Sequence, residues 1–298
     1  MIDRIVKYIK YWTPVEMKNF YRKVKRRYER QVKLSGEDRL PLSLASFEKI
    51  LRENLNIVEG DTLIIHSSFG NMNADFSPEE AITLLKTIVG ESGNLLMPFY
   101  PTGHAYYWIQ EGGVFDVYTS RSFMGILTQK FKESNGVKLS PHPAKALSAW
   151  GKDRDWLIGE HHMSRYPYDK YSPYFKTKSL PNSKTVGLGV EINSFFHACE
   201  DLFLQEKSEI YSEQLFEGKM NYYGEMQTVR TYLHQPEKVN SIISPCNFLK
   251  QTDCPDYRLV LVKGVPYYSV RNESVYLHAK KLLEQGISRT TFSKKSTN

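Results

Sequence analysis

A histidine and a glutamate stand three residues apart in the stretch Ser194-Phe195-Phe196-His197-Ala198-Cys199-Glu200. If this stretch is helical, His197 and Glu200 share one face, and the carboxylate could orient or activate the imidazole. Asn193 and Ser194 are residue types that cap the start of such a helix. The spacing predicts either a catalytic pair or an ordinary surface pair and leaves both open.

A second histidine, His142, lies between Pro141 and Pro143. Two flanking prolines restrict the backbone and disfavour a helix, so the ring is expected on a rigid turn. Because the unperturbed pKa of imidazole lies near neutral pH, a histidine fixed in this way could act as a general base. A purely structural histidine is the alternative.

Two polar segments have the composition of a cofactor site. The first segment, over 66–70, follows a strand expected over 61–66, and ligands of open α/β sheets bind beyond the carboxyl ends of the strands. The second segment, over 120–125, is expected to open a helix, where exposed N–H groups would suit a phosphate. Ordinary capping is the alternative for both. The candidate cofactor-binding residues are His66, Ser67, Ser68, Gly70, Ser120, Arg121, Ser122, Met124 and Gly125.

Several common site types are not indicated. The chain has no Walker or dinucleotide fingerprint and no Gly-x-Ser-x-Gly elbow. His161 and His162 stand apart from other ligands at zinc-like spacing, so no metal is expected.

The elements that would position these residues alternate between strand and helix. We expect a serine-capped helix from Ser43, a helix over 78–89 with Ser77 as its cap, and strands over 61–66, 94–98 and 184–190. A strand, a helix and a strand within about forty residues predict a right-handed crossover in a sheet covered by helices. The fold class is therefore α/β.

The rest of the chain gives less regular signals. The aromatic, glycine-bearing section 99–115 predicts a long functional loop. Strands over 257–262 and 265–270 and a helix over 274–284 are expected to follow. The polar tail, 288–298, is expected to be disordered.

The formal charge of +7 is concentrated at the start of the chain. Residues 1–33 hold eleven Lys or Arg and three Asp or Glu, so the remainder carries about −1, and a nucleic-acid binder is not expected. We expect residues 1–40 to form a basic amphipathic helical arm. It would contact an anionic membrane surface or an acidic partner, or else pack on the body or on a second subunit. No secretory signal or membrane span is expected, and three scattered cysteines favour a reducing cytoplasm.

The order and spacing of the blocks over about 60–201 resemble one family, the aminoglycoside 3-N-acetyltransferases and their relatives. The matching blocks are His66-Ser67-Ser68, Leu96-Met97-Pro98, Phe115-Asp116 with Ser120 and Met124-Gly125, Ser140-x-His142-Pro143 with Ala149-Trp150-Gly151, Ser172-Pro173, Leu188-Gly189-Val190, and Ser194-x-x-His197-x-x-Glu200. The resemblance implies a three-layer α/β/α fold with a central mixed sheet, and a CoA-dependent N-acyltransferase domain over 41–287. It also implies that acetyl-CoA, or another acyl-CoA, donates an acyl group to an amine of a sugar.

Carried over by motif, His142, His197 and Glu200 are the expected catalytic region. His142 would be the base, and Glu200 would orient an imidazole or attract the ammonium form of the acceptor. Ser67 or Ser68 would touch the pantetheine or thioester, and the segment 120–125 would meet the phosphates. Cys199 is expected to be a core side chain, because direct attack on a thioester needs no protein nucleophile.

The acceptor is less constrained, because Leu139 stands where drug-modifying relatives tend to carry arginine. Few acids lie near the motifs, and basic residues are interspersed among them, which favours an anionic acceptor over a polycation. We expect a nucleotide-linked amino sugar for surface polysaccharide synthesis. The alternatives are an aminoglycoside, which would make the chain a resistance enzyme, and a non-catalytic CoA- or sugar-binding protein. The candidate acceptor-binding residues are Tyr100, Tyr106, Trp108, Asp116 and Asp169.

Overall fold

The computed structural model describes residues 40–103 and 105–296, so most of the predicted arm over 1–40 lies outside the described residues.

The centre of the fold is strand β1 (Thr62–Ser67), whose side chains alternate between two hydrophobic cores. Leu63 and Ile65 enter one core and Ile64 enters the other, all 1% exposed or less. A strand buried on both faces is typical of a parallel sheet covered by helices.

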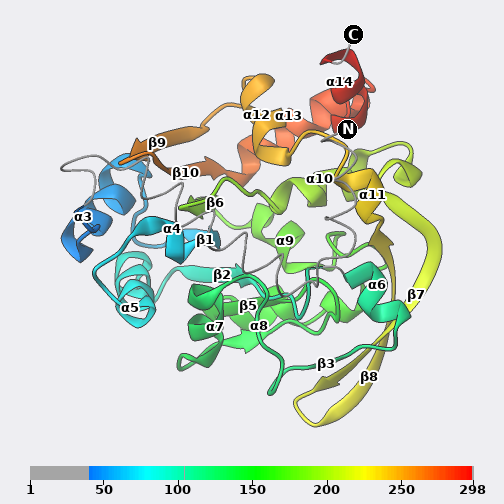
Figure 1. Cartoon of the computed structure of the whole chain (residues 1–298), viewed down its shortest axis with the longest axis horizontal. Coiled ribbons are helices and arrows are strands. Elements are labelled where there is room, and N and C mark those ends of the chain that lie inside the picture. Colours follow the sequence, from blue (N-terminus) through cyan, green and yellow to red (C-terminus); the bar gives the residue numbers. More distant parts are fainter. Residues whose placement is uncertain (1–39, 104, 297–298) are drawn as a thin grey trace, which may run out of the picture. The chain divides into compact units, whose positions relative to one another are not determined.

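Seven strands form the main sheet in the order β4-β5-β2-β1-β6-β10-β9 (Figure 1). β1 pairs in parallel with β2 and with β6, whereas the pairs toward both edges are antiparallel. The mixed sheet implied by the family resemblance is therefore confirmed. The other strands of this sheet are β2 (Asn94–Pro98), β4 (Lys138–Leu139), β5 (Leu147–Gly151), β6 (Ser183–Leu188), β9 (Arg258–Val262) and β10 (Val265–Arg271).

One face of the sheet is covered by three helices: α3 (Leu44–Lys49), which continues as a π-helix over Ile50–Asn54, α5 (Pro78–Val89) and α7 (Ile126–Glu133). The predicted start of α5 is confirmed: the Ser77 hydroxyl accepts the Glu80 N–H and the Glu80 carboxylate accepts the Ser77 N–H. The Ser43 cap of α3 is confirmed as well.

The opposite face carries the helices that surround the second core. They are α8 (Arg154–Ile158), α9 (Pro173–Lys176), α10 (Phe195–Phe203), α12 (Pro245–Gln251) and α13 (Asn272–Glu284). Phe196 of α10 packs edge-on against Phe248 of α12, with ring centroids 5.5 Å apart. Helices on both faces give the three-layer α/β/α architecture implied by the family resemblance.

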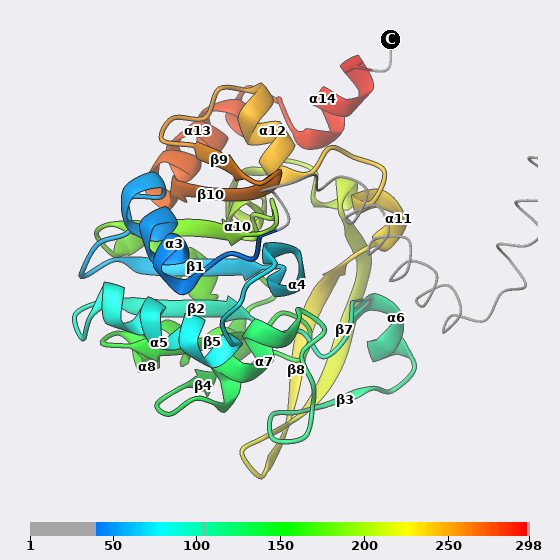
Figure 2. The same cartoon turned by 60° about the vertical axis from the view of Figure 1, so that its left-hand side comes forward.

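A second, three-stranded sheet consists of β3 (Val114–Asp116), β7 (Tyr211–Tyr222) and β8 (Glu225–His234). Tyr223 and Gly224 turn the β7–β8 hairpin with positive φ angles, as tight hairpin turns require. In Figure 2 the hairpin lies on the side of the main sheet where α4 (Phe69–Met72) follows β1. It therefore stands near the edge at which the parallel strands end.

The remaining helices are short. They are α6 (Ala105–Gln110), α11 (Pro236–Val239), α14 (Arg289–Ser296) and the 3-10 turns His161–Met163, Thr177–Ser179 and Lys207–Glu209. Among the described residues, no helix is long and apolar enough to span a membrane.

Two predicted elements differ in the structure. Section 99–115 is not one long loop, because α6 forms within it and packs Ile109 in a small core with Phe216. The helix predicted from Ser120 begins only at Ile126. Residues before it form a turn, because the Asp116 carboxylate accepts the N–H groups of residues 118 and 119 and Gly125 adopts a φ of 105°.

The tail also differs from the prediction of disorder over 288–298. Residues Arg289–Ser296 form α14, and Arg289 is 1% exposed. The Ser288 hydroxyl accepts the Thr291 N–H and donates to Glu209, which fixes the start of this helix. Three polar residues at the start of this segment, Ser288, Arg289 and Thr291, therefore make specific hydrogen bonds.

Candidate active site

The His197–Glu200 pair predicted from the sequence forms on α10. Nδ1 of His197 lies 2.7 Å from Oε2 of Glu200, and their side chains are 13% and 2% exposed. Asn193 caps the helix by accepting the Phe196 N–H through its side-chain oxygen. The prediction of a helix that holds both residues on one face is confirmed.

The protonation states of this pair follow from its surroundings. Burial alone would raise the pKa of Glu200, but the charge of Arg289 and the contacts with His197 hold that pKa at about 2. An ionised carboxylate only accepts hydrogen bonds, so Nδ1 of His197 carries the proton. Burial lowers the pKa of His197 against the opposing effect of Glu200, so the ring is neutral near pH 7 with its lone pair on Nε2.

His142 lies on the turn between β4 and β5, as its two prolines predict. Nδ1 of His142 accepts the backbone N–H groups of Ala144 at 3.2 Å and Lys145 at 3.1 Å. A nitrogen that accepts two hydrogen bonds carries no proton, so the neutral ring has its proton on Nε2. Nε2 is buried and has no partner among the described residues. Burial also lowers the pKa of His142 well below its ordinary value.

His161 contacts the turn that carries His142 in two ways. Its ring stacks on His142 with centroids 4.6 Å apart and an angle of 28° between the planes. Nε2 of His161 donates to the carbonyl of Pro167 at 2.9 Å, so Nδ1 accepts the hydroxyl of Ser140 at 2.7 Å. The Ser140 oxygen in turn accepts the Leu147 N–H at 2.8 Å. These bonds fix the plane of the His161 ring, against which the His142 ring stacks.

Aromatic and histidine rings from distant segments pack around His197. Tyr168 and His234 have ring centroids 5.0 Å and 4.8 Å from that of His197. The Tyr174 and Tyr100 hydroxyls are 2.8 Å apart, and the Tyr168 hydroxyl is 3.3 Å from that of Tyr100. The Tyr100 hydroxyl also interacts with the Ser194 side chain at the start of α10. Tyr100 is thus the one predicted acceptor-binding residue that the structure brings to this cluster.

Lys145 adds a positive charge to the same cluster. Its Nζ lies 4.3 Å from the centroid of the Tyr100 ring, and its charge acts on His142, His197 and His234. Burial lowers the pKa of Lys145 to about 8. Within the described residues it forms no ion pair with a carboxylate, so the aromatic face is its principal partner.

The end of β1 reaches the start of α10. Nε2 of His66 accepts the Ser194 N–H at 3.2 Å, so the neutral His66 ring carries its proton on Nδ1. Burial lowers the pKa of His66 to about 3, with a further contribution from His197. Ser67 and Ser68 follow at the strand end and are partly exposed. The predicted cofactor segment from His66 is therefore next to the start of α10, the helix that carries the His197–Glu200 pair.

Three buried groups at this edge fit an oxygen-rich ligand such as acyl-CoA. Nδ1 of His66, Nδ2 of Asn193 and Nε2 of His142 have no partner among the described residues, and each is a hydrogen-bond donor in the assigned state. Leaving a buried donor unpaired costs about 1–3 kcal/mol. Amide and thioester oxygens would satisfy such donors.

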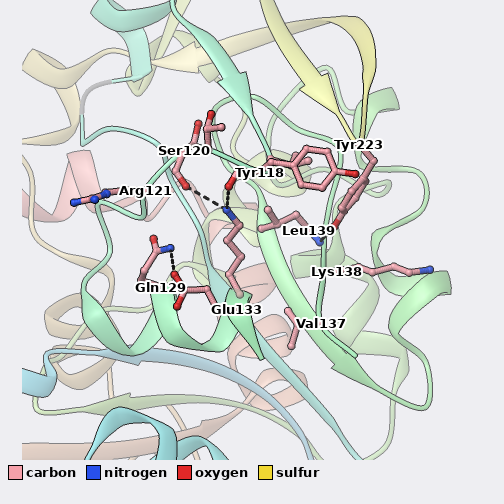
Figure 3. Close-up of a pocket in the computed structure, with 12 residues that line it drawn as sticks. Tyr118, Ser120, Arg121, Gln129, Glu133, Val137, Lys138, Leu139 and Tyr223 are labelled. Carbon is pink, nitrogen blue, oxygen red and sulfur yellow. Dashed lines mark hydrogen bonds between the residues drawn. The ribbon is translucent and has the colours of Figure 1, made fainter. Parts of the chain in front are cut away.

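The second predicted cofactor segment lies in another place. Ser120 and Arg121 line a pocket of about 430 Å³ together with Lys132, Lys138 and Tyr223, and Lys132 donates to the carbonyls of residues 118 and 120 (Figure 3). None of His142, His197 and Glu200 lines this pocket. Ser122 donates and accepts within the turn, where its hydroxyl accepts the Met124 N–H and its N–H donates to Gln129. Gly70 and Gly125 are exposed.

The other predicted acceptor-binding residues have structural partners. Tyr106 packs on Phe216, and Trp108 packs on two small cores. Asp116 accepts an N–H of Asn221 and two backbone N–H groups, and Asp169 accepts the backbone N–H groups of residues 165, 166 and 171. Their carboxylates hold turns, which spacing in the sequence does not reveal.

Some functional candidates were missed in the sequence. Tyr168, His234 and Arg289 come from separate segments and have no motif around them. Nothing in the sequence distinguishes Lys145 from the other basic residues interspersed among the motifs. Cys199 is fully buried, and burial raises the pKa of its thiol well above the ordinary value, which fits the predicted core role. No cluster of three or more metal-ligating side chains occurs within the described part of the chain.

Comparison with known proteins gives one family match. A family model described as aminoglycoside 3-N-acetyltransferase matches residues 64–270.

Several solved structures share the fold at low sequence identity. Aminoglycoside acetyltransferase AAC(3)-Xa has a TM-score of 0.71 at 18% identity, over 88% of this chain and 98% of that chain. AAC-VIa bound to sisomicin has a TM-score of 0.69 at 17% identity, over 83% and 99%. A binary complex of AAC-IIIb with CoASH has a TM-score of 0.65 at 18% identity, over 81% and 96%.

Proposed function

The chain belongs to the aminoglycoside 3-N-acetyltransferase family, and from this premise we propose that it acetylates a primary amine on an aminoglycoside-type amino sugar. As a member of the family it is a CoA-dependent N-acetyltransferase with acyl-CoA as the donor. The nucleotide-linked amino sugar favoured from the sequence gains no support from the comparisons, and the aminoglycoside alternative fits them better.

We assign the base to His197. The observation that carries this assignment is the 2.7 Å contact between His197 Nδ1 and the ionised Glu200, because it leaves the lone pair on Nε2. His142, expected to be the base from the family resemblance, has the opposite tautomer. Its Nδ1 is occupied by two backbone N–H groups, and its Nε2 presents a proton.

When bound, acetyl-CoA supplies an acetyl group as a reactive thioester. Nε2 of His197 would take a proton from the attacking amine, because an ammonium has no lone pair with which to attack. Glu200 would stabilise the imidazolium that results. Nε2 of His142 would donate a hydrogen bond to the oxygen on which negative charge develops. Nε2 of His197 would then return its proton to the leaving sulfur.

The donor would lie at the end of β1. Nδ1 of His66 and the hydroxyls of Ser67 and Ser68 are the proposed contacts, because they lie beside the start of α10 and the buried donor is unpaired. Ser120 and Arg121 remain candidates for the phosphates, since their pocket also contains Lys132 and Lys138. Three cationic side chains, Arg121, Lys132 and Lys138, and several hydroxyls suit a polyanion.

A thiol-release assay tests the proposal. The purified full chain and acetyl-CoA are offered sisomicin and other aminoglycosides in one panel and nucleotide-linked amino sugars in another. We expect release of free thiol with the aminoglycosides and its loss in His197→Ala. Turnover with the nucleotide-linked sugars alone would contradict the proposed acceptor, and turnover with neither panel would contradict the activity on amino sugars.

A further inference from the structure

Arg289 connects the last described helix to the catalytic carboxylate. Its Nε donates to Oε1 of Glu200 at 2.7 Å, and its Nη2 donates to Oε2 at 3.2 Å. Its Nη1 donates to the carbonyl of Ile243 at 2.9 Å. Each nitrogen of the guanidinium is therefore bonded, and both residues of the ion pair are 1% exposed.

We propose that Arg289 is a positioning residue for acetyl transfer, which holds both oxygens of Glu200 and thereby keeps His197 in the tautomer and orientation that a base requires. The inference rests on the function proposed above and deepens it. Arg289 lies 19 positions beyond residue 270, where the family match ends, so that match does not assign it a role.

The two bonds from Arg289 fix the plane of the carboxylate. Oε2 of Glu200 receives both Nη2 of Arg289 and Nδ1 of His197, so the position of one donor determines where the other can bind. A guanidinium presents parallel N–H groups at a fixed spacing, whereas a lysine ammonium is a single point charge. Lysine could therefore supply the charge but not the two-point geometry.

The charge of Arg289 also controls which atom carries the proton. Burial would otherwise favour the protonated form of Glu200, and the charge of Arg289 is the largest influence opposing it. A neutral carboxyl would instead donate a hydrogen bond to Nδ1 of His197. The ring proton would then sit on Nε2, and the ring could no longer accept a proton from the amine.

Arg289 is itself held in place. The Ser293 hydroxyl donates to the Arg289 carbonyl at 2.8 Å and accepts the Ile243 N–H at 2.9 Å, which ties α14 to the segment that Nη1 of Arg289 also contacts. The guanidinium carbon lies 6.0 Å from the centroid of the Phe196 ring. A buried, fully bonded arginine on a fixed helix start can impose its geometry on its partner.

Other groups act on His197 besides Glu200 and Arg289. Their charges or rings reach it from β1, the β4–β5 turn, the segment before α9 and the hairpin. The titratable groups are His66, Lys145, Tyr168 and His234. Since Arg289 and Lys145 both lower the pKa of His197, removal of either charge should raise it.

Three variants of the full chain test the proposal. Arg289→Met removes both the positive charge and the paired N–H donors of the guanidinium, and Arg289→Lys keeps the charge but not the paired donors. Lys207→Met is the matched control, because Lys207 Nζ donates to the backbone carbonyls of Glu200 and Leu204 at the end of α10 and does not touch the carboxylate. The measurements are kcat, KM for acetyl-CoA and the acceptor, the pH dependence of kcat/KM, and thermal unfolding.

We expect Arg289→Met to lower kcat about 100-fold, within the contribution of a positioned base. Its KM for acetyl-CoA should stay within about threefold, since the contacts proposed for CoA do not include Arg289. The acid limb of kcat/KM should move to higher pH, because loss of the cation raises the pKa of His197. Arg289→Lys should retain the position of the limb and lose about tenfold in kcat. Lys207→Met should match the wild type in kcat and in the position of the acid limb.

Wild-type kcat and an unshifted limb in Arg289→Met would overturn the proposal and leave Arg289 a purely structural residue. If Arg289→Met does not fold, a wild-type kcat in folded Arg289→Lys would overturn the two-point geometry. Nitrogen-15 NMR of histidine-labelled protein supplies a readout without turnover. We expect the wild type to show His197 with its proton on Nδ1, and Arg289→Met to show a raised His197 pKa or a shifted tautomer. An unchanged His197 signal refutes the positioning role even where no acceptor is turned over, and an inactive wild type with the expected signal refutes only the proposed function.

Discussion

Replacement of His142 and His197 by alanine and by glutamine separates the roles assigned to the two rings. Glutamine places an amide nitrogen near the position of imidazole Nε2, so it can donate a hydrogen bond but cannot act as a base near neutral pH. His142 is assigned a donor role because Nδ1 accepts two backbone N–H groups. His197 is assigned the base because Glu200 holds the proton on Nδ1.

The expected losses follow from these roles. Removing a positioned base costs about 10²–10⁴ in rate, so His197→Ala and His197→Gln should both lose that much. Removing one donor to a developing oxyanion costs about 10²–10³, so His142→Ala should lose that much and His142→Gln should recover part of it. The decisive comparison is whether glutamine rescues position 142 and fails at position 197.

The pH dependence gives a second, independent measurement. A base must be unprotonated, and burial lowers the pKa of His197 below its ordinary value of 6.5. The wild-type kcat/KM should therefore fall as pH drops through a value below 6.5. This acid limb should persist in His142→Gln and disappear in His197→Gln, with the same acceptor used throughout so that its own titration is shared. A limb that disappears with His142 and survives without His197 would refute the reasoning from the tautomers.

Three further predictions concern residues around the site. Lys145→Met removes a positive charge that acts on His142 and His197, so the KM for a polycationic aminoglycoside should fall, and an unchanged KM would mean that this charge does not face the acceptor. Lys184→Met leaves Asp61 without its buried ion-pair partner and should reduce the free energy of unfolding by about 3–5 kcal/mol in urea titration while kcat of the folded enzyme is unchanged. Ser140→Ala leaves Nδ1 of His161 unpaired and should cost about 1–3 kcal/mol of stability, against which a melting temperature equal to the wild type would count.

The centre of the main sheet could be predicted because its signals are local, whereas β4 and β5 were not predicted as strands. β1, α5 and β2 are encoded by a buried run, a capping box around Ser77 and glycines before Asn94, all within a span of 37 residues. The His197–Glu200 pair could be predicted for the same reason, since three residues in a helix fix the relative position of two side chains. Local patterns of this kind predict the structure that their own residues adopt in the fold.

The rest of the site depends on contacts between distant segments. Arg289 reaches Glu200 across 89 residues, and Tyr100 reaches Tyr174 across 74, and no periodicity connects such positions. The tautomer of His142 depends on backbone N–H groups whose directions only the folded turn determines. The failed helix start at Ser120 has a comparable cause, because the turn bonds of Asp116 compete with the hydroxyl caps that favoured a helix there.

The long chain distance between Glu200 and Arg289 bears on how the enzyme is made. A ribosome that has just released α10 must still add about ninety residues before Arg289 can reach the carboxylate, at about 5–20 residues per second. Until then Glu200 is a carboxyl group in an apolar core without its cation, which favours the protonated form and an inactive histidine. On the positioning role proposed for Arg289, a chain translated only as far as residue 288 should transfer acetyl groups at least about 100-fold more slowly than one that contains α14.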